Sequence, residues 1–139
     1  MKKTWKLKIC SLLLTAIMLL TQTTVSAEVL ETQDNGPLPS RYQTIIQISA
    51  ALKITGNTAK CLGDVMLKSG HSGTLTVTLQ RKNGNSWIYV TSWTGNVPIG
   101  GSKTILETKS LSIHGTYRVK VYFVSSTETE TLYSQTAVY

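Results

Sequence analysis

The sequence predicts an all-β domain over residues 42–139, built as a two-sheet antiparallel sandwich of about seven strands. Three observations predict it. Apolar and polar residues alternate at period two, Gly or Asn interrupts the alternation about every 8 to 12 residues, and no window shows a helical apolar stripe. Short turns between the runs favour a sandwich over a barrel.

The predicted strands, in order, are residues 46–54, 59–67, 74–79, 86–93, 104–113, 116–124 and 131–139. In the first two, every second residue is apolar or small, and Gly56-Asn57 between them predicts a hairpin. The third alternates leucine and valine with threonine. Asn83-Gly84 follows it and predicts a tight hairpin, because this dipeptide supplies the positive φ angles that such a turn needs.

The last three strands differ in regularity. Residues 104–113 place Ile105, Leu111 and Ile113 on one parity, with poorly defined ends. The following strand is clearer, since its odd-numbered positions from Tyr117 to Phe123 are apolar and its even-numbered positions include Arg118, Lys120 and Tyr122. This pattern predicts one buried and one solvated face. The final run, 131–139, closes the sheet.

Residues 1–27 have the three-part build of a secretory signal peptide. Four lysines precede an apolar stretch from Ile9 to Leu20, and the segment ends Val25-Ser26-Ala27. Cleavage is expected after Ala27, leaving Glu28 as the mature N-terminus. The alternative, an uncleaved anchor, is disfavoured because a membrane-spanning helix needs about 20 apolar residues. Residues 28–41, rich in acids and prolines, are predicted to be a flexible leader. The expected product is secreted and extracellular, and it meets the membrane only during export.

The net charge of +7 comes from 14 Lys and Arg against 7 Asp and Glu, but four of the lysines lie within residues 1–27. A charge of +3 therefore remains after export. The remaining cations are scattered apart from Arg81-Lys82, so no basic stripe predicts nucleic acid as a partner. The mature domain is expected to be a monomer.

Two cysteines are present, and export separates them. Cys10 lies within the predicted signal peptide, so Cys61 has no intramolecular partner after cleavage. Its place on the apolar parity of residues 59–67 predicts a buried thiol. Pairing with another chain remains the alternative.

The stretch from Ile113 to Val121 resembles the sixth-strand signature of immunoglobulin-like sandwiches, in which Gly-x-Tyr precedes a core residue. The resemblance implies an immunoglobulin-like β-sandwich in which Tyr117 is the tyrosine-corner residue. It also implies that Val119 and Cys61 stand where that family has its two cysteines.

More broadly, residues 42–139 look like an uncharacterised family of small secreted proteins of Gram-positive bacteria. The residues that carry this likeness are Leu79-Gln80-Arg81-Lys82, Trp87, Trp93 and Gly115-Thr116-Tyr117-Arg118-Val119-Lys120. The likeness implies export and a sandwich fold, and it carries over no functional residue.

Catalysis, cofactors and metals are not predicted. The loop Gly70-His71-Ser72-Gly73 lacks the final glycine and the helix of a hydrolase elbow. Cys61 with His71 or His114 would need an exposed, electropositive thiol. The two histidines and the glutamates lack the paired spacing of a three- or four-ligand metal site. Glu128 and Glu130 are expected on one face of a hairpin, where a solvated turn is favoured over weak Ca²⁺ binding.

The aromatic segment Trp87, Tyr89, Trp93 is the candidate ligand-binding site. The three share one parity, and Ile88 and Val90 take the other, so both faces of this strand are apolar. Exposed rings on a strand can stack on sugars or anchor a protein. The alternatives are that a Trp caps the core or that a β-bulge rotates the strand. We therefore predict a secreted, non-catalytic module that binds an extracellular glycan or protein. The alternative function is a bacteriocin-like effector acting on other cells.

Overall fold

The computed structural model describes residues 42–139. The predicted signal peptide 1–27, its cleavage site at Ala27 and Glu28, and the predicted leader 28–41 lie outside the described residues. Eight strands follow one another in the described part: β1 (Ile45–Thr55), β2 (Thr58–Leu67), β3 (Gly73–Asn83), β4 (Ser86–Val97), β5 (Ser102–Ser110), β6 (Thr116–Val124), β7 (Thr129–Tyr133) and β8 (Ala137–Val138). No helix in this part of the chain is long and apolar enough to span a membrane.

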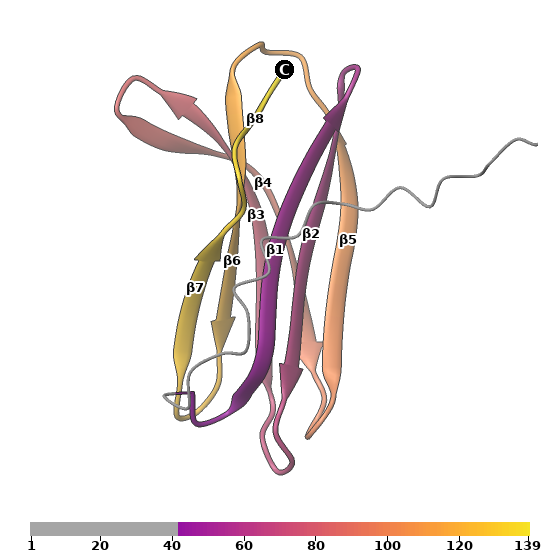
Figure 1. Ribbon diagram of the computed structural model, residues 1–139, viewed down its shortest axis with the longest axis vertical. Coiled ribbons are helices and arrows are strands. Elements are labelled where there is room, and N and C mark those ends of the chain that lie inside the picture. The colour runs from indigo at the N-terminus through magenta and orange to yellow at the C-terminus, as the bar shows by residue number, and fades with distance from the viewer. Residues whose placement is uncertain (1–41) are drawn as a thin grey trace, which may run out of the picture.

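The strands form two sheets that pack face to face (Figure 1). One sheet has the order β1-β2-β5, and the other has the order β4-β3-β6-β7 with β8 also paired to β6. Every pairing is antiparallel. The predicted all-β, two-sheet antiparallel sandwich is therefore confirmed, and its strand order suits an immunoglobulin-like sandwich.

The strand count is eight because the predicted last strand, 131–139, is split in two. At the break, the Ser134 side chain pairs with the β6 backbone in place of a backbone carbonyl. Its hydroxyl accepts a hydrogen bond from the Val119 N–H at 2.9 Å. The Ser134 N–H in turn donates to the Val119 carbonyl at 2.9 Å. This side-chain pairing interrupts the regular ladder, so β7 ends at Tyr133 and β8 begins at Ala137.

The core lies between the sheets and follows the predicted alternation along most strands, and the first departure is at the start of β1. Ile48 and Ala50 are buried as predicted, but Ile46 is exposed and Ile45 is buried instead. The cause is a register shift between Ile45 and Gln47 in the pairing with β2. A bulge inserts one unpaired residue and thereby exchanges the two faces of the strand.

Both long hairpins turn on Gly-Asn. Thr55 pairs with Thr58 across Gly56-Asn57, and Asn83 pairs with Ser86 across Gly84-Asn85. The second turn was predicted at Asn83-Gly84, but Asn83 is the last residue of β3. Only the glycine of each turn has a positive φ, +56° and +58° respectively. Glycine in the first central position with a positive φ is typical of a type II′ turn.

The structure contains the hydrogen bond that the sequence resemblance implied for Tyr117. The Tyr117 hydroxyl donates to the Ile113 carbonyl four residues upstream, which is the bond of a tyrosine corner. Cys61 on β2 and Val119 on β6 are both fully buried in one core cluster. Cys61 is a free thiol.

Candidate binding face

A β-bulge in β4 separates the three aromatic residues that were predicted to share one face. In the register with β3, Leu79 pairs with Thr91 but Gln80 pairs with Tyr89, so Val90 is the extra residue. Trp93 pairs with the buried Val77 and packs against the core. The prediction of a single aromatic face was therefore wrong for Trp93, and the stated alternative of a β-bulge that rotates the strand is confirmed.

Trp87 and Tyr89 lie on the other side, on the solvent side of the four-strand path β4-β3-β6-β7. We call this surface the outer face. The strand registers assign to it the residues Thr74, Thr76, Thr78, Gln80, Lys82, Trp87, Tyr89, Ser92, Thr94, Asn96, Thr116, Arg118, Lys120, Tyr122, Val124, Thr129, Thr131 and Tyr133. It combines four aromatic rings with three cations and many hydroxyl groups.

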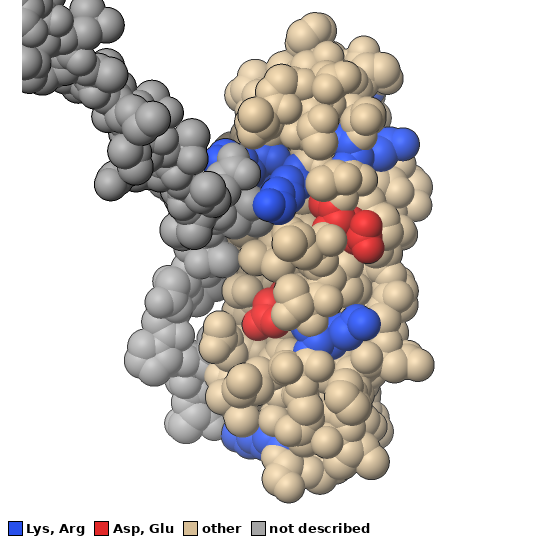
Figure 2. Space-filling model, turned by 90° about the vertical axis from the view of Figure 1, so that its right-hand side faces the viewer, with Lys and Arg blue, Asp and Glu red and all other residues tan. Residues whose placement is uncertain are grey.

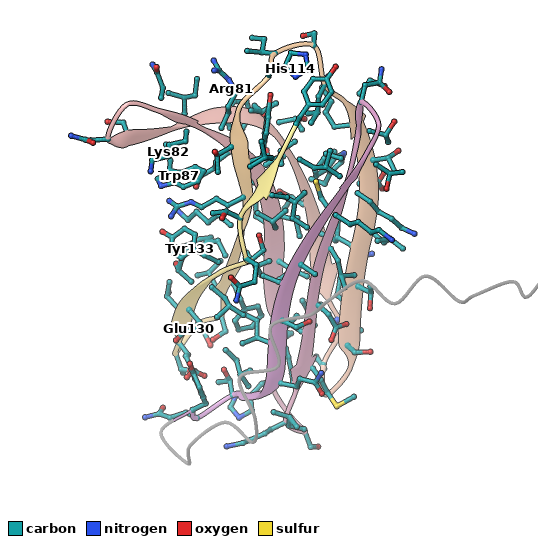
Figure 3. The ribbon with its side chains drawn as sticks, turned by 45° about the horizontal axis from the view of Figure 1, so that its top comes forward. Arg81, Lys82, Trp87, His114, Glu130 and Tyr133 are labelled. Atoms are coloured by element: carbon teal, nitrogen blue, oxygen red, sulfur yellow. The ribbon has the colours of Figure 1, made fainter. Side chains whose placement is uncertain are left out.

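The centre of the outer face is a stack of Trp87, Arg118 and Tyr133. The guanidinium carbon of Arg118 lies 4.2 Å from the centre of the Trp87 ring and 4.0 Å from that of Tyr133. The Arg118 Nε–H also donates to Gln80 Oε1 at 2.9 Å. Figure 3 shows the two labelled rings one above the other along the sheet. These contacts hold the guanidinium group in one orientation, since planar cations stack well on aromatic faces.

Two further tyrosines complete the outer face. Tyr89 is 67% exposed, and its hydroxyl lies 3.3 Å from the Ser92 hydroxyl. Tyr122 lies on β6 with the Lys120 ammonium group 5.7 Å from its ring centre. Exposed aromatic side chains of this size, gathered on one sheet, mark interaction surfaces.

The opposite side of the molecule has a different character. Figure 2, which looks onto the side where β5 lies, shows Lys or Arg side chains interspersed with Asp and Glu. On this sheet, Asp64 accepts a hydrogen bond from the Thr104 hydroxyl at 2.6 Å. Lys103, Glu107 and Lys109 share the parity of the buried Ile105. Inward-pointing charges on an edge strand discourage pairing with another chain.

Trp93 lines a shallow groove between the edge strands β4 and β5. The groove has a volume of about 420 Å³ and is also lined by Lys103, Ile105, Leu106 and Glu107. Trp93 is only partly buried against the core. Trp93 is therefore separated from the outer face by the β4 backbone.

The residues considered for catalysis are kept apart. His71 follows the end of β2 and His114 follows the end of β5, and these strands are antiparallel, so the histidines lie at opposite ends of the sheet. His114 stacks on Tyr139 with ring centres 4.3 Å apart. Cys61 is fully buried, and burial raises the pKa of its thiol to about 12. Such a thiol is a poor nucleophile.

Glu128, one of the two acidic residues considered as metal ligands, binds the start of the described chain. The Glu128 carboxylate accepts hydrogen bonds from the Thr44 backbone N–H at 2.8 Å and from the Thr44 hydroxyl. Burial raises the pKa of Glu128, but these bonds and those from the backbone of Gln43 and Ile45 outweigh it, so the net pKa is lowered. Among residues 42–139, no group of three His, Cys, Asp or Glu side chains is placed to hold a metal ion.

Comparison with known proteins adds little to this description. No protein-family model and no curated protein matches the chain. Among solved structures, the chain is similar to the solution structure of CsgH from R. palustris, with a TM-score of 0.43 and 9% identity. The alignment covers 63% of this chain and 88% of that one.

Arg118 and Tyr133 are site residues that the sequence analysis did not identify. The alternation in residues 116–124 did place Arg118 on a solvated face, and that was the available signal. The stack itself could not be predicted without the strand order, because Trp87 comes from β4 and Tyr133 comes from β7.

Proposed function

We propose that this protein is a secreted, non-catalytic binding module that contacts its ligand through the outer face. The observation that carries the proposal is the ordered stack of Trp87, Arg118 and Tyr133, flanked by the highly exposed Tyr89. Aromatic residues and arginine contribute most strongly to binding surfaces. Here they are held in place by the sheet, so little side-chain entropy is lost on binding.

Polysaccharide is the favoured class of ligand. The aromatic centre is surrounded by hydroxyl and amide side chains, including Thr76, Thr78, Gln80 and Ser92. Thr76 and Thr94, facing each other across β3 and β4, have their hydroxyls 3.0 Å apart. A surface that offers rings and short polar groups together suits sugars, which present apolar C–H faces and many hydroxyls. A protein ligand is the alternative outcome of the test below.

Secretion rests on the signal-peptide pattern of residues 1–27. The likeness to small secreted proteins of Gram-positive bacteria supports the same proposal. N-terminal sequencing of protein recovered from the culture medium should begin at Glu28. A chain retained in the cells, or one that begins at Met1, would contradict this part.

The binding proposal is tested with a single-tryptophan reporter. Of the three Trp residues, Trp5 lies in the predicted signal peptide, so in the mature chain Trp93→Phe leaves Trp87 alone in the stack. Its fluorescence should change saturably when cell-wall polysaccharides are added. The matched control, Trp87→Phe, leaves Trp93 alone and should respond less. An unresponsive Trp87 across neutral and charged glycans would reject the site. A response to extracellular proteins alone would reassign the ligand class.

A further inference from the structure

The charged side chains of the outer face are all positive. This face carries Lys82, Arg118 and Lys120, and the registers of the described strands place no Asp or Glu on it. The nearest acid on β7, Glu130, pairs with the buried Phe123 and so belongs to the inward parity. Resting on the function proposed above, we propose that the ligand of the outer face is a carboxylated polysaccharide whose carboxylates bind Arg118 and Lys120.

Arg118 is prepared to bind a carboxylate. The two rings cover its planar group, and its Nε–H is used by Gln80. Within the described residues, its terminal Nη groups have no hydrogen-bond partner in the structure. A guanidinium fixed in this way can present its Nη groups to a carboxylate as a fork, which is the geometry of strong bidentate pairing.

Lys82 and Lys120 lie on either side of Arg118 along the strand direction, so the three cations form a row. Lys120 lies two residues beyond Arg118 on the same face of β6. Lys82 lies two residues beyond Gln80, the β3 partner of Arg118, in the opposite direction. Successive residues on one face of a strand are about 7 Å apart. A linear polymer with repeating negative charges, lying along β3 and β6, therefore meets all three cations.

Two other polyanions fit this surface less well. Single-stranded nucleic acid is bound along a positively charged groove that follows a backbone with one phosphate per nucleotide, whereas the registers of the described strands place three separate cations on the outer face. Anionic membranes attract clusters of about 4 to 8 basic residues, and the outer face has only Lys82, Arg118 and Lys120. A sugar polymer needs fewer charges because hydroxyl and aromatic contacts supply the remainder.

The experiment compares polygalacturonate with its fully methyl-esterified form by isothermal titration calorimetry of the purified protein. The two polymers share a backbone and differ in carboxylate charge. Dextran sulfate, polyphosphate and duplex DNA are titrated in parallel. We expect saturable binding of polygalacturonate and at least about tenfold weaker binding of the ester, because charge-assisted hydrogen bonds are lost.

Three variants assign the effect to residues. Arg118→Lys keeps the charge but removes the fork, and it should weaken polygalacturonate binding by about tenfold. Lys82→Gln with Lys120→Gln should weaken binding and reduce its dependence on salt. Lys60→Gln removes a charge from the outer side of β2, in the other sheet, and serves as the matched control with little effect. The double Gln variant keeps the proposal testable if Arg118→Lys does not fold.

The outcomes separate the two proposals. Equal binding of the acid and the ester overturns the carboxylate proposal and leaves the binding module intact. Equal binding of sulfate, phosphate and carboxylate polymers, unaffected by Arg118→Lys, shows non-specific charge attraction and also overturns it. Failure of every polymer to bind, together with an unresponsive Trp87 reporter, overturns both proposals.

Discussion

Gly63 on β2 leaves no room for a side chain against the opposite sheet, and substituting it should destabilise the sandwich. A Cβ atom there would lie 2.3 Å from Val77 Cγ2 and 2.9 Å from Val121 Cγ2. Carbon atoms pack best at about 3.5 to 4.0 Å, so the first contact would have to lengthen by more than about 1 Å. Both valines are fully buried. We expect Gly63→Ala to cost about 1 to 3 kcal/mol through overpacking.

The clash with Val77 makes a sharper test possible through a double-mutant cycle. Val77→Ala removes two buried methyl groups, which should cost about 2 to 3 kcal/mol once the cavity is included. In the double variant, the methyl of the new alanine at 63 enters the space that Val77 Cγ2 has left. We therefore expect the double variant to lose about 1 to 2 kcal/mol less than the two single losses added together.

Urea unfolding followed by circular dichroism measures the free energy of unfolding of each variant. Val119→Ala is the control partner, because Val119 is also fully buried on β6 but is not among the atoms nearest the added Cβ. Its combination with Gly63→Ala should be additive within about 0.5 kcal/mol. The reasoning is refuted if Gly63→Ala is neutral, or if the cycle with Val77→Ala is additive.

Three further predictions concern single residues. Tyr117→Phe removes the tyrosine-corner bond to the Ile113 carbonyl and should lower the free energy of unfolding by about 0.5 to 1.5 kcal/mol; an unchanged urea midpoint would contradict this. Glu128 has a lowered pKa in the folded state, so its stabilising effect is present above its unfolded pKa of about 4.3 and is lost as pH falls through the lower folded pKa. Glu128→Gln should therefore be less stable than the parent at pH 7, with a difference that shrinks towards pH 3, and a constant difference in urea midpoint would speak against the sign. Cys61 is buried with a thiol pKa of about 12, so it should resist iodoacetamide in the native protein and react after unfolding in urea, whereas rapid native labelling, read by mass spectrometry, would disprove its burial.

The sequence predicted most of the strands because period-two alternation directly reflects burial on one face of a sheet. The strand predicted at 116–124 agrees with β6 (Thr116–Val124). The alternation predicted the wrong buried residues where a bulge in the pairing with the neighbouring strand exchanged the two faces. Ile46 in β1 and Val90 in β4 are each the extra residue of a bulge. Nothing in the local sequence requires a bulge at either position.

The same limit explains why the candidate site was only half predicted. Trp87 and Tyr89 were recognised as unusual because they are aromatic and close together in the chain, but Trp93 was grouped with them through a parity that the bulge reverses. For a different reason, the strand predicted at 104–113 was too long. β5 ends at Ser110, and Ile113, which was predicted to share a face with Ile105, is exposed beyond that end.

The stack at the centre of the outer face depends on the order of strands, which no single segment encodes. Its three members come from β4, β6 and β7, and the Gln80 that orients Arg118 comes from β3. The order β4-β3-β6-β7 brings all four side chains to one surface. Since the core packing between the sheets positions β3 and β6, residues such as Gly63 support the binding face without touching it. A ligand that needs the fixed Arg118 fork should therefore bind less tightly to the Gly63→Ala protein if the overpacking moves Val77 and Val121, whereas binding through charge alone should be unaffected.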